Sequence, residues 1–137
     1  QIQSNTALDI NNRTLLGSTL GLDLDQSGNS FIGLGSFWEA EFYGISPNAK
    51  GLRANAMFAS EWSGDVVEWT VLVYYQPYWM NLNDYRAIIN SDFRVEVSES
   101  IEIGTSLSSR FDSRPHSNLF PWDFSLLTTL RYSFNKS

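Results

Sequence analysis

The chain has no cysteine among its 137 residues, and it has only two lysines and one histidine. The absence of cysteine excludes a disulfide framework and thiolate metal ligands. Nine lysines and arginines stand against fifteen aspartates and glutamates, so the net charge is −6 and no basic patch exists to neutralise nucleic-acid phosphates. A soluble surface of this size usually carries many lysines. The scarcity of lysine indicates that the charged residues have a place other than a solvated surface.

Long apolar runs are also missing. The longest, Val71 to Tyr75, has the length of a strand and is far short of a transmembrane helix. No signal peptide precedes the first strand pattern, which predicts a mature form if the protein is secreted. Gly-rich phosphate loops, paired-histidine metalloprotease motifs and zinc-ligand spacings do not occur.

Apolar and polar residues alternate along the chain with a period of two, most clearly from Ile101 to Phe134. Eight such runs predict an all-β fold, an antiparallel up-and-down transmembrane β-barrel with a polar, charged interior and an apolar exterior. The chain is expected to form one domain, residues 1–137. The predicted strands are 1–10, 14–25, 30–43, 51–62, 66–79, 85–97, 101–113 and 122–134.

Alternation alone does not distinguish this barrel from a soluble lipocalin-like one, in which apolar residues point inward. Five tryptophans and many Phe, Leu and Ile residues share the apolar parity, and eight strands could not enclose that volume. The opposite parity is rich in glycine and arginine. These features favour the membrane barrel, with lipid outside.

Aromatic residues of the apolar parity fall mostly near the ends of the predicted strands, as in the two aromatic girdles of membrane barrels. The residues predicted to face lipid are Trp38, Trp62, Trp69, Trp79, Trp122, Tyr132 and Phe134.

The predicted connections alternate in length, with short turns at 25–29, 63–65 and 98–100 and longer loops at 44–51, 80–84 and 114–121. This pattern places the short turns on the periplasmic rim. Asn11-Asn12 is an exception, a tight connection on the long-loop rim.

The polar parity predicts an interior charge network. The expected register of the hairpin around Glu99 places Glu96 opposite Glu102, Arg94 opposite Gly104 and Arg86 opposite Asp112. Across the third loop, Glu41 is expected beside Arg53. Arg94 and Arg131 are both expected to reach Glu96 and Glu102. An ion pathway is one interpretation, and simple pairing of buried charges is the favoured one. The residues assigned to the network are Glu41, Arg53, Arg86, Arg94, Glu96, Glu102, Arg110, Asp112 and Arg131.

Candidates for catalysis are few. His116 with Ser117 is the one nucleophile–base pair, and a solvated loop histidine explains it better. Glu39 and Glu41 could suit acid–base work or a cation site, and pairing with Arg53 explains them more simply. We therefore predict no enzyme activity, no cofactor and no metal site.

Two segments carry a resemblance to a known family: YYQPYWMNLNDYR at Tyr74 to Arg86, and SLSSRFDSRP at Ser106 to Pro115. They resemble the YdiY-like salt-induced outer-membrane protein family (domain of unknown function 481), whose pattern has Tyr-x-Pro, a short loop, Asp-Tyr-Arg, a later Tyr-Asp-Ser-x-Pro-Pro loop and a final Tyr-Ser-Phe. The matching positions are Tyr75, Pro77, Asp84, Tyr85, Arg86, Phe111, Asp112, Ser113, Pro115, Tyr132, Ser133 and Phe134.

The chain departs from that pattern at His116, which replaces a second proline, and in the three residues that follow Phe134. Members of the family are also longer, with further strands upstream. The resemblance implies an outer-membrane β-barrel without an established biochemical activity.

These observations predict a bacterial outer-membrane β-barrel of structural, envelope-stress or interaction type. Its expected partners are outer-membrane lipids and another envelope protein at the long-loop rim. Two alternatives stay open: a narrow cation-preferring pore, motivated by twelve acidic residues against five arginines on the polar parity, and a soluble lipocalin-like barrel that binds an apolar ligand.

Overall fold

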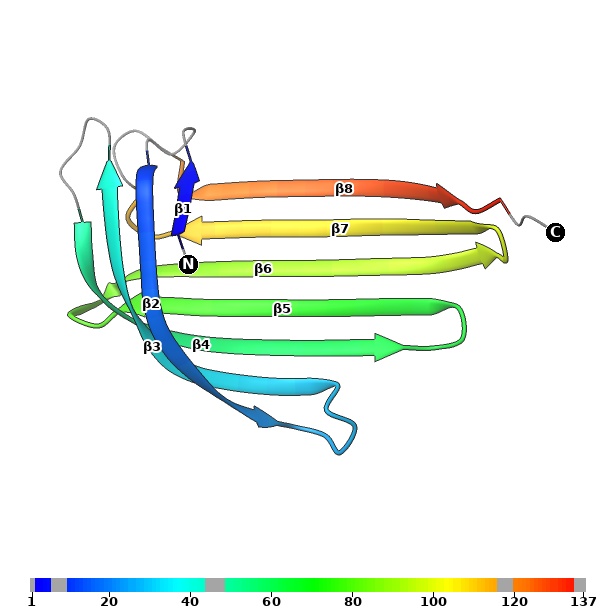
Figure 1. Cartoon of the computed structure of the whole chain (residues 1–137), viewed down its shortest axis with the longest axis horizontal. Helices are drawn as coiled ribbons and strands as arrows, with labels where there is room; N and C mark the ends of the chain where they lie inside the picture. The colour runs from blue at the N-terminus through cyan, green and yellow to red at the C-terminus, as the bar shows by residue number, and fades with distance from the viewer. Residues whose placement is uncertain (1, 6–9, 44–48, 116–119, 135–137) are drawn as a thin grey trace.

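The computed structural model describes residues 2–5, 10–43, 49–115 and 120–134. These residues form one eight-stranded sheet in which each strand pairs antiparallel with its neighbours along the chain (Figure 1). The strands are β1 (Ile2–Asn5), β2 (Ile10–Asp23), β3 (Ser30–Tyr43), β4 (Ala49–Ser63), β5 (Val67–Tyr78), β6 (Asn81–Ser98), β7 (Ile101–Asp112) and β8 (Trp122–Tyr132). The predicted all-β, up-and-down topology is therefore confirmed.

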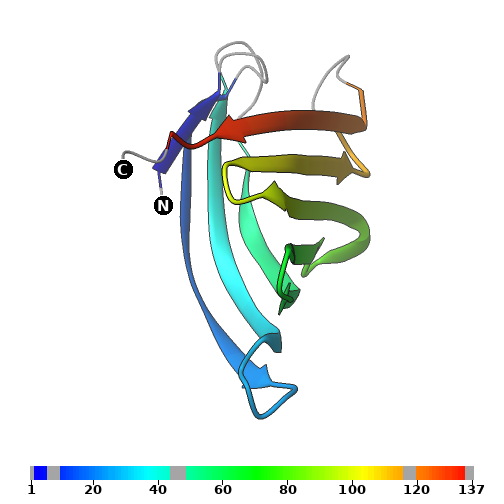
Figure 2. The same ribbon diagram turned by 90° about the vertical axis from the view of Figure 1, so that its right-hand side faces the viewer.

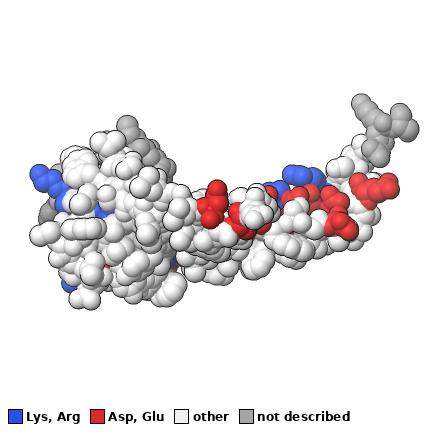
Figure 3. All heavy atoms as spheres, turned by 90° about the horizontal axis from the view of Figure 1, so that it is seen from below, with Lys and Arg blue, Asp and Glu red and all other residues white. Residues whose placement is uncertain are grey.

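The sheet differs at its two ends. At the end where β1, β3, β5 and β7 finish, here named the curled end, the strands wrap around a common interior. At the opposite end, here named the splayed end, connections 24–29, 64–66 and 99–100 lie on a thinner, flatter part of the sheet (Figure 3). Most of the acidic residues visible in Figure 3 lie on this thinner part.

The sheet is not closed into a barrel in the part of the chain that the structure describes. Seen from the splayed end, it curves from β2 through β5 to β8, and its two edges do not meet (Figure 2). β1 covers only the beginning of β2, with Ile2 opposite Thr14, and β8 pairs with β7 alone. The outermost strands are β1, which has only four residues, and β8; beyond β1 the free edge is β2, which is steeply inclined to β8 in Figures 1 and 2.

Several predicted boundaries are corrected. The first strand ends at Asn5 instead of residue 10, and Asn11 and Asn12 belong to β2 instead of forming a turn. The predicted loop at 80–84 is a two-residue connection, Trp79 and Met80, because β6 already begins at Asn81. The prediction failed here because Asn81, Asn83 and Asp84 were interpreted as loop formers, whereas Asn81 lies opposite Tyr78 of β5 and residues 82–84 form an irregularity near the start of β6.

Burial in this sheet is the reverse of that in a water-soluble protein. Ala40 and Pro77 are the buried apolar residues among those whose burial is described, whereas Glu39, Glu41, Arg53, Asn55 and Arg86 are all buried. Leu16, Leu20 and Leu130 are about three-quarters exposed. The whole chain exposes 9879 Å², against about 7,200 Å² expected for a compact soluble protein of this mass.

No helix suited to crossing a membrane is found among the described residues, a result that has no bearing on crossing by strands.

Candidate functional site

Six charged side chains meet on the concave side of the sheet at the curled end. They are named here the buried ion network and come from β3, β4, β6 and β7: Glu39, Glu41, Arg53, Asp84, Arg86 and Asp112. Alternation places them there, because each belongs to the inward parity of its strand and lies near the same end of the sheet.

Arg86 is the centre of the network. Its Nη1 lies 2.6 Å from Oε1 of Glu39, its Nη2 lies 3.1 Å from Oε1 of Glu41, and its Nε lies 2.9 Å from Oδ2 of Asp112. The two glutamates are on β3, and β3 is not adjacent to β6 in the sheet. These ion pairs therefore cross the interior, and they tie opposite walls of the curl together.

Arg53 also binds Glu39. Its Nε donates to Oε2 of Glu39 at 2.7 Å, and its Nη1 donates to the backbone carbonyl oxygen of Gln76 at 3.3 Å. Its Nη2 lies 3.0 Å from Oδ1 of Asp84, but that buried oxygen accepts no hydrogen bond, so the contact is electrostatic only. The Tyr78 ring lies over the guanidinium group at 5.5 Å, within the range of a cation–π interaction.

A layer of amides continues the polar contacts toward the middle of the sheet. Gln76 Nε2 donates to Oδ1 of Asn55 at 3.1 Å, and Asn55 Nδ2 donates to Oγ1 of Thr19 at 3.3 Å. These bonds link β5, β4 and β2 across the interior. They satisfy side chains that would otherwise be buried without partners.

Glycines make room for this filling. A Cβ atom on Gly51 would collide with the ring of Tyr78, and one on Gly33 would collide with the side chain of Met57. The glycines of the inward parity therefore permit large side chains to pack within a narrow curl, as the sequence predicted.

The predicted register is correct for β6 and β7. Glu96 lies opposite Glu102, Arg94 opposite Gly104 and Arg86 opposite Asp112. The hairpin turn between these strands fixes the pairing, and it was correctly located.

The predicted pair of Glu41 with Arg53 is wrong. Arg53 binds Glu39, and Glu41 binds Arg86. Glu41 lies opposite Ala49, and Arg53 lies opposite Phe37, because β4 begins at Ala49 instead of residue 51 and its pairing with β3 begins at Glu41 instead of Tyr43.

The other predicted charges lie apart from the buried ion network. Arg131 approaches Glu102 at 3.4 Å, whereas Arg94 approaches Glu68 at 3.8 Å, and more than half of each arginine side chain is exposed. Thus the predicted contact of both arginines with both Glu96 and Glu102 reduces to one pair, Arg131 with Glu102. Such exposed pairs contribute about 0–1 kcal/mol.

Arg110, the remaining predicted member, is half-buried. Its Cα lies opposite that of Asp123 on β8.

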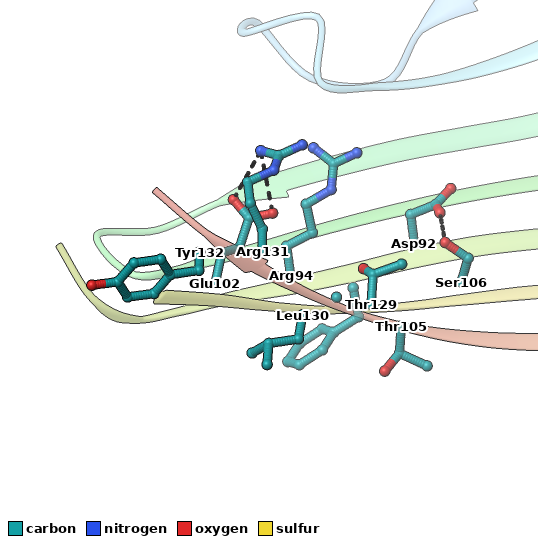
Figure 4. Close-up of a pocket in the computed structure, with 11 residues that line it drawn as sticks. Asp92, Arg94, Glu102, Thr105, Ser106, Thr129, Leu130, Arg131 and Tyr132 are labelled. Carbon is teal, nitrogen blue, oxygen red and sulfur yellow. Dashed lines mark hydrogen bonds and ion pairs between the residues drawn. The ribbon is translucent and has the colours of Figure 1, made fainter. Parts of the chain in front are cut away.

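Figure 4 shows the hollow beside these exposed pairs, which has a volume of about 590 Å³. Arg94, Arg131 and Glu102 project to one side of the sheet, and Leu130 projects to the other. Ser106 donates a hydrogen bond to Asp92 within the hollow. The polar face and the apolar face predicted from alternation thus lie on opposite sides of this part of the sheet.

Four members of this polar interior were missed as members of the predicted charge network: Glu39, Asp84, Asn55 and Gln76. Glu39 was considered as a partner of Arg53 and, with Glu41, as an acid–base or cation pair; Asp84 was assigned to a loop, and the two amides were not singled out. Their inward parity was the available signal, but contacts between strands that are not neighbours, such as β3 with β6, cannot be obtained from pairwise register.

The aromatic residues predicted to face lipid are all exposed: Trp38, Trp62, Trp69, Trp79, Trp122, Tyr132 and Phe134. At the curled end, a row of rings crosses four strands, with centroid distances of 5.5 Å for Tyr75–Tyr85, 5.5 Å for Tyr85–Phe111 and 4.7 Å for Phe111–Trp122. At the splayed end, Trp62 lies opposite Trp69. Aromatic groups therefore lie near both ends of the apolar face.

Two candidates for chemistry remain. His116 and Ser117 lie outside the described residues. Glu39 and Glu41, the candidate acid–base or cation pair, are both engaged by arginine. No cluster of three or more potential metal ligands occurs in the described part of the chain.

Comparison with protein-family models, with curated proteins and with solved structures finds no match to this chain.

Proposed function

We propose that the protein is a bacterial outer-membrane β-barrel with a structural, envelope-stress or interaction role. The observation that carries this proposal is the reversed burial: charged side chains are enclosed at the curled end, and leucine, phenylalanine and tryptophan cover the outer face. In water such a face would be exposed at a large free-energy cost, whereas in lipid it needs no further partner.

Strand length supports the same proposal. The shortest of the seven long strands, β8, has eleven residues. At a rise of about 3.3 Å per residue and a tilt of about 40°, such a strand spans about 28 Å, close to the thickness of a hydrocarbon core. The aromatic residues near both ends of the outer face would then lie at the two interfaces.

The buried ion network supports a role without transport. It fills the interior at the curled end with paired charges, and Met57, Phe37 and Tyr74 of the same inward parity add bulky side chains to that face of the sheet. Any protein partner would meet the rim of the curled end, which carries the connection 113–121. The resemblance to salt-induced outer-membrane proteins belongs to this proposal.

A cation-preferring pore is the second candidate, favoured by the acidic residues on the splayed part of the sheet (Figure 3). A soluble lipocalin-like barrel is disfavoured, because its large apolar side chains would have to point inward, whereas here they are exposed.

Depth-dependent quenching of tryptophan by brominated lipids tests the proposal. The purified chain is refolded into phosphatidylcholine vesicles with bromine at several acyl positions. We expect strong quenching, with most tryptophans near the two interfaces. A monodisperse monomer in buffer without detergent, whose fluorescence brominated vesicles leave unchanged, would contradict membrane insertion.

A further inference from the structure

The apolar outer face of the sheet carries a single charged residue, Lys50, among the strand residues whose side chains the structure describes. Lys50 lies opposite Ala40, and Leu52 lies opposite Trp38, so alternation places Lys50 on the same outward parity as these apolar neighbours. The lysine is exposed, and it forms no ion pair with any residue that the structure describes. Its anionic partner must therefore come from outside the described part of the chain.

The position of Lys50 along β4 fixes its depth in a membrane. Trp62, near the other end of the same strand and on the same face, follows Lys50 by twelve residues. At a rise of about 3.3 Å per residue and a tilt of about 40°, this separation spans about 30 Å, the thickness of a hydrocarbon core. When Trp62 lies at one interface, Lys50 lies at the other, where its long side chain reaches the lipid phosphates.

Apolar side chains lie directly beneath Lys50 on this face. Trp38 and Phe42 occupy the two positions of β3 that are diagonal to Lys50. Trp79 donates its backbone N–H to the carbonyl oxygen of Leu52 at 2.9 Å, which brings a further exposed indole to the same region. A cation at the rim of an exposed apolar and aromatic surface matches an anionic amphiphile, with its headgroup at the rim and its acyl chains below.

The connections at the two ends of the sheet carry opposite charges. Each of the three connections at the splayed end contains an exposed acidic residue, and these are Asp25, Asp65 and Glu99. At the curled end, the charged residue in the described parts of the connections is Arg114, which is exposed. An anionic lipid surface is therefore attracted to the curled end and repelled by the splayed end.

We propose that the outer face of the curled end binds an anionic lipid, whose phosphate contacts Lys50 and whose acyl chains lie on Leu52, Trp38 and Trp79. This inference rests on the proposed membrane location and adds to it a preference for one class of lipid. The strands that form the site, β3 to β5, are central in the sheet, so the site does not depend on how the edges of the sheet are covered.

Brominated lipids with different headgroups test this site. Vesicles contain equal amounts of phosphatidylcholine and phosphatidylglycerol, and bromine is on the acyl chains of only one of the two lipids. Two variants each retain one tryptophan, with the others replaced by phenylalanine: one retains Trp38, beside Lys50, and the other retains Trp62, at the opposite end of the face. Both leaflets have the same composition, so the direction of insertion does not affect the result.

We expect phosphatidylglycerol to be enriched about fivefold over phosphatidylcholine at Trp38, which corresponds to about 1 kcal/mol for one lysine near a membrane surface. No enrichment is expected at Trp62. In the background that retains Trp38, Lys50→Gln should abolish the enrichment, and Lys50→Arg should keep it. Arg131→Gln is the matched control, because it removes an exposed cation of inward parity near the splayed end. Circular dichroism should be unchanged in all of these variants.

Added inorganic phosphate, compared with chloride at equal ionic strength, distinguishes a lipid phosphate from a soluble one. Equal enrichment at Trp38 and Trp62, enrichment that persists in Lys50→Gln or is lost in Arg131→Gln, or a loss specific to inorganic phosphate would each overturn the inference. A chain that both brominated lipids quench equally contradicts the lipid site alone. A chain that neither lipid quenches contradicts the membrane proposal, and the lipid site with it.

Discussion

Among individual residues, Arg86 has the greatest expected influence on stability. It pairs with three carboxylates of the buried ion network, and Glu39 and Glu41 among them are almost fully buried. Replacing it removes the one cation that binds all three carboxylates, although Glu39 keeps its ion pair with Arg53, and breaking a buried ion pair typically costs more than the intact pair contributes.

We expect Arg86→Met to lower the free energy of unfolding by about 3–5 kcal/mol, the range for breaking a buried ion pair. The measurement is urea unfolding in detergent micelles or vesicles. Arg131→Met is the matched control, because that arginine is mostly exposed and pairs loosely with Glu102. Its expected effect is below about 1 kcal/mol. Equal effects of the two substitutions would contradict a special role for the buried ion network.

Gly51 tests the close packing beside the same network. A Cβ atom there would collide with the ring of Tyr78, so we expect Gly51→Ala to destabilise the fold by about 1–3 kcal/mol, as overpacking commonly does. Gly21→Ala is the control, because a Cβ there meets its nearest neighbours only at 3.8 Å. In a Tyr78→Ala background the penalty at Gly51 should largely disappear, and a persistent penalty would locate the cause in the backbone instead.

Asp25 allows a prediction about pH in the turn between β2 and β3. Desolvation acts to raise the pKa of its carboxyl group, but hydrogen bonds from Ser27 Oγ and the backbone N–H of Asn29 outweigh it, so the pKa is lowered. A lowered pKa means that the turn gains stability above the ordinary pKa of an aspartate and loses it as the pH falls through the folded value. Carboxyl NMR titration should show this pKa rising in Ser27→Ala, and an unchanged value would exclude that hydrogen bond as a cause.

At the scale of the element, strands were predictable where a short turn lies between two clear alternations. The β6–β7 register followed from the turn near Glu99, and all three predicted pairs on it are correct. The β3–β4 register was wrong because a longer connection separates Tyr43 from Ala49, and Arg53 lies opposite Phe37, four residues from the expected partner Glu41. The contact of Arg86 with Glu39 was beyond prediction, since it depends on curvature accumulated over several strands.

The two faces of β8 give the element-scale prediction. Leu126 lies on the apolar parity, and Leu127 lies on the polar one, while both are similarly exposed. If the outer face contacts lipid, Leu126→Arg should cost about 2–4 kcal/mol in a bilayer, as for arginine near the midplane of a barrel. Leu127→Arg should cost clearly less, because its side chain points to the interior. Folding titrations in vesicles measure both, and equal costs would mean that the outer face is not in lipid.

At the scale of the whole molecule, the reversed burial could be predicted from parity and composition, whereas the failure of the described sheet to close into a barrel could not. Alternation in residues 1–10 predicted a full first strand that would close the sheet, but β1 ends at Asn5 and covers only the beginning of β2. Closure depends on the length of one strand relative to its neighbours, and periodicity does not encode that length.

Whether the protein conducts ions depends on whether the interior of the curled end is filled. Ion pairs between opposite walls occupy the curled end, where Arg86 reaches both Glu41 on β3 and Asp112 on β7. A conducting path would have to break these pairs, so we expect the wild-type protein to show no stepwise current in a planar bilayer at low voltage. If the buried ion network blocks the passage of ions, Arg86→Met should raise the frequency of channel openings, whereas Arg131→Met should produce no current. Steady cation-selective current through the wild-type protein would favour the pore over the structural role, because the ion network would then line a path instead of closing one.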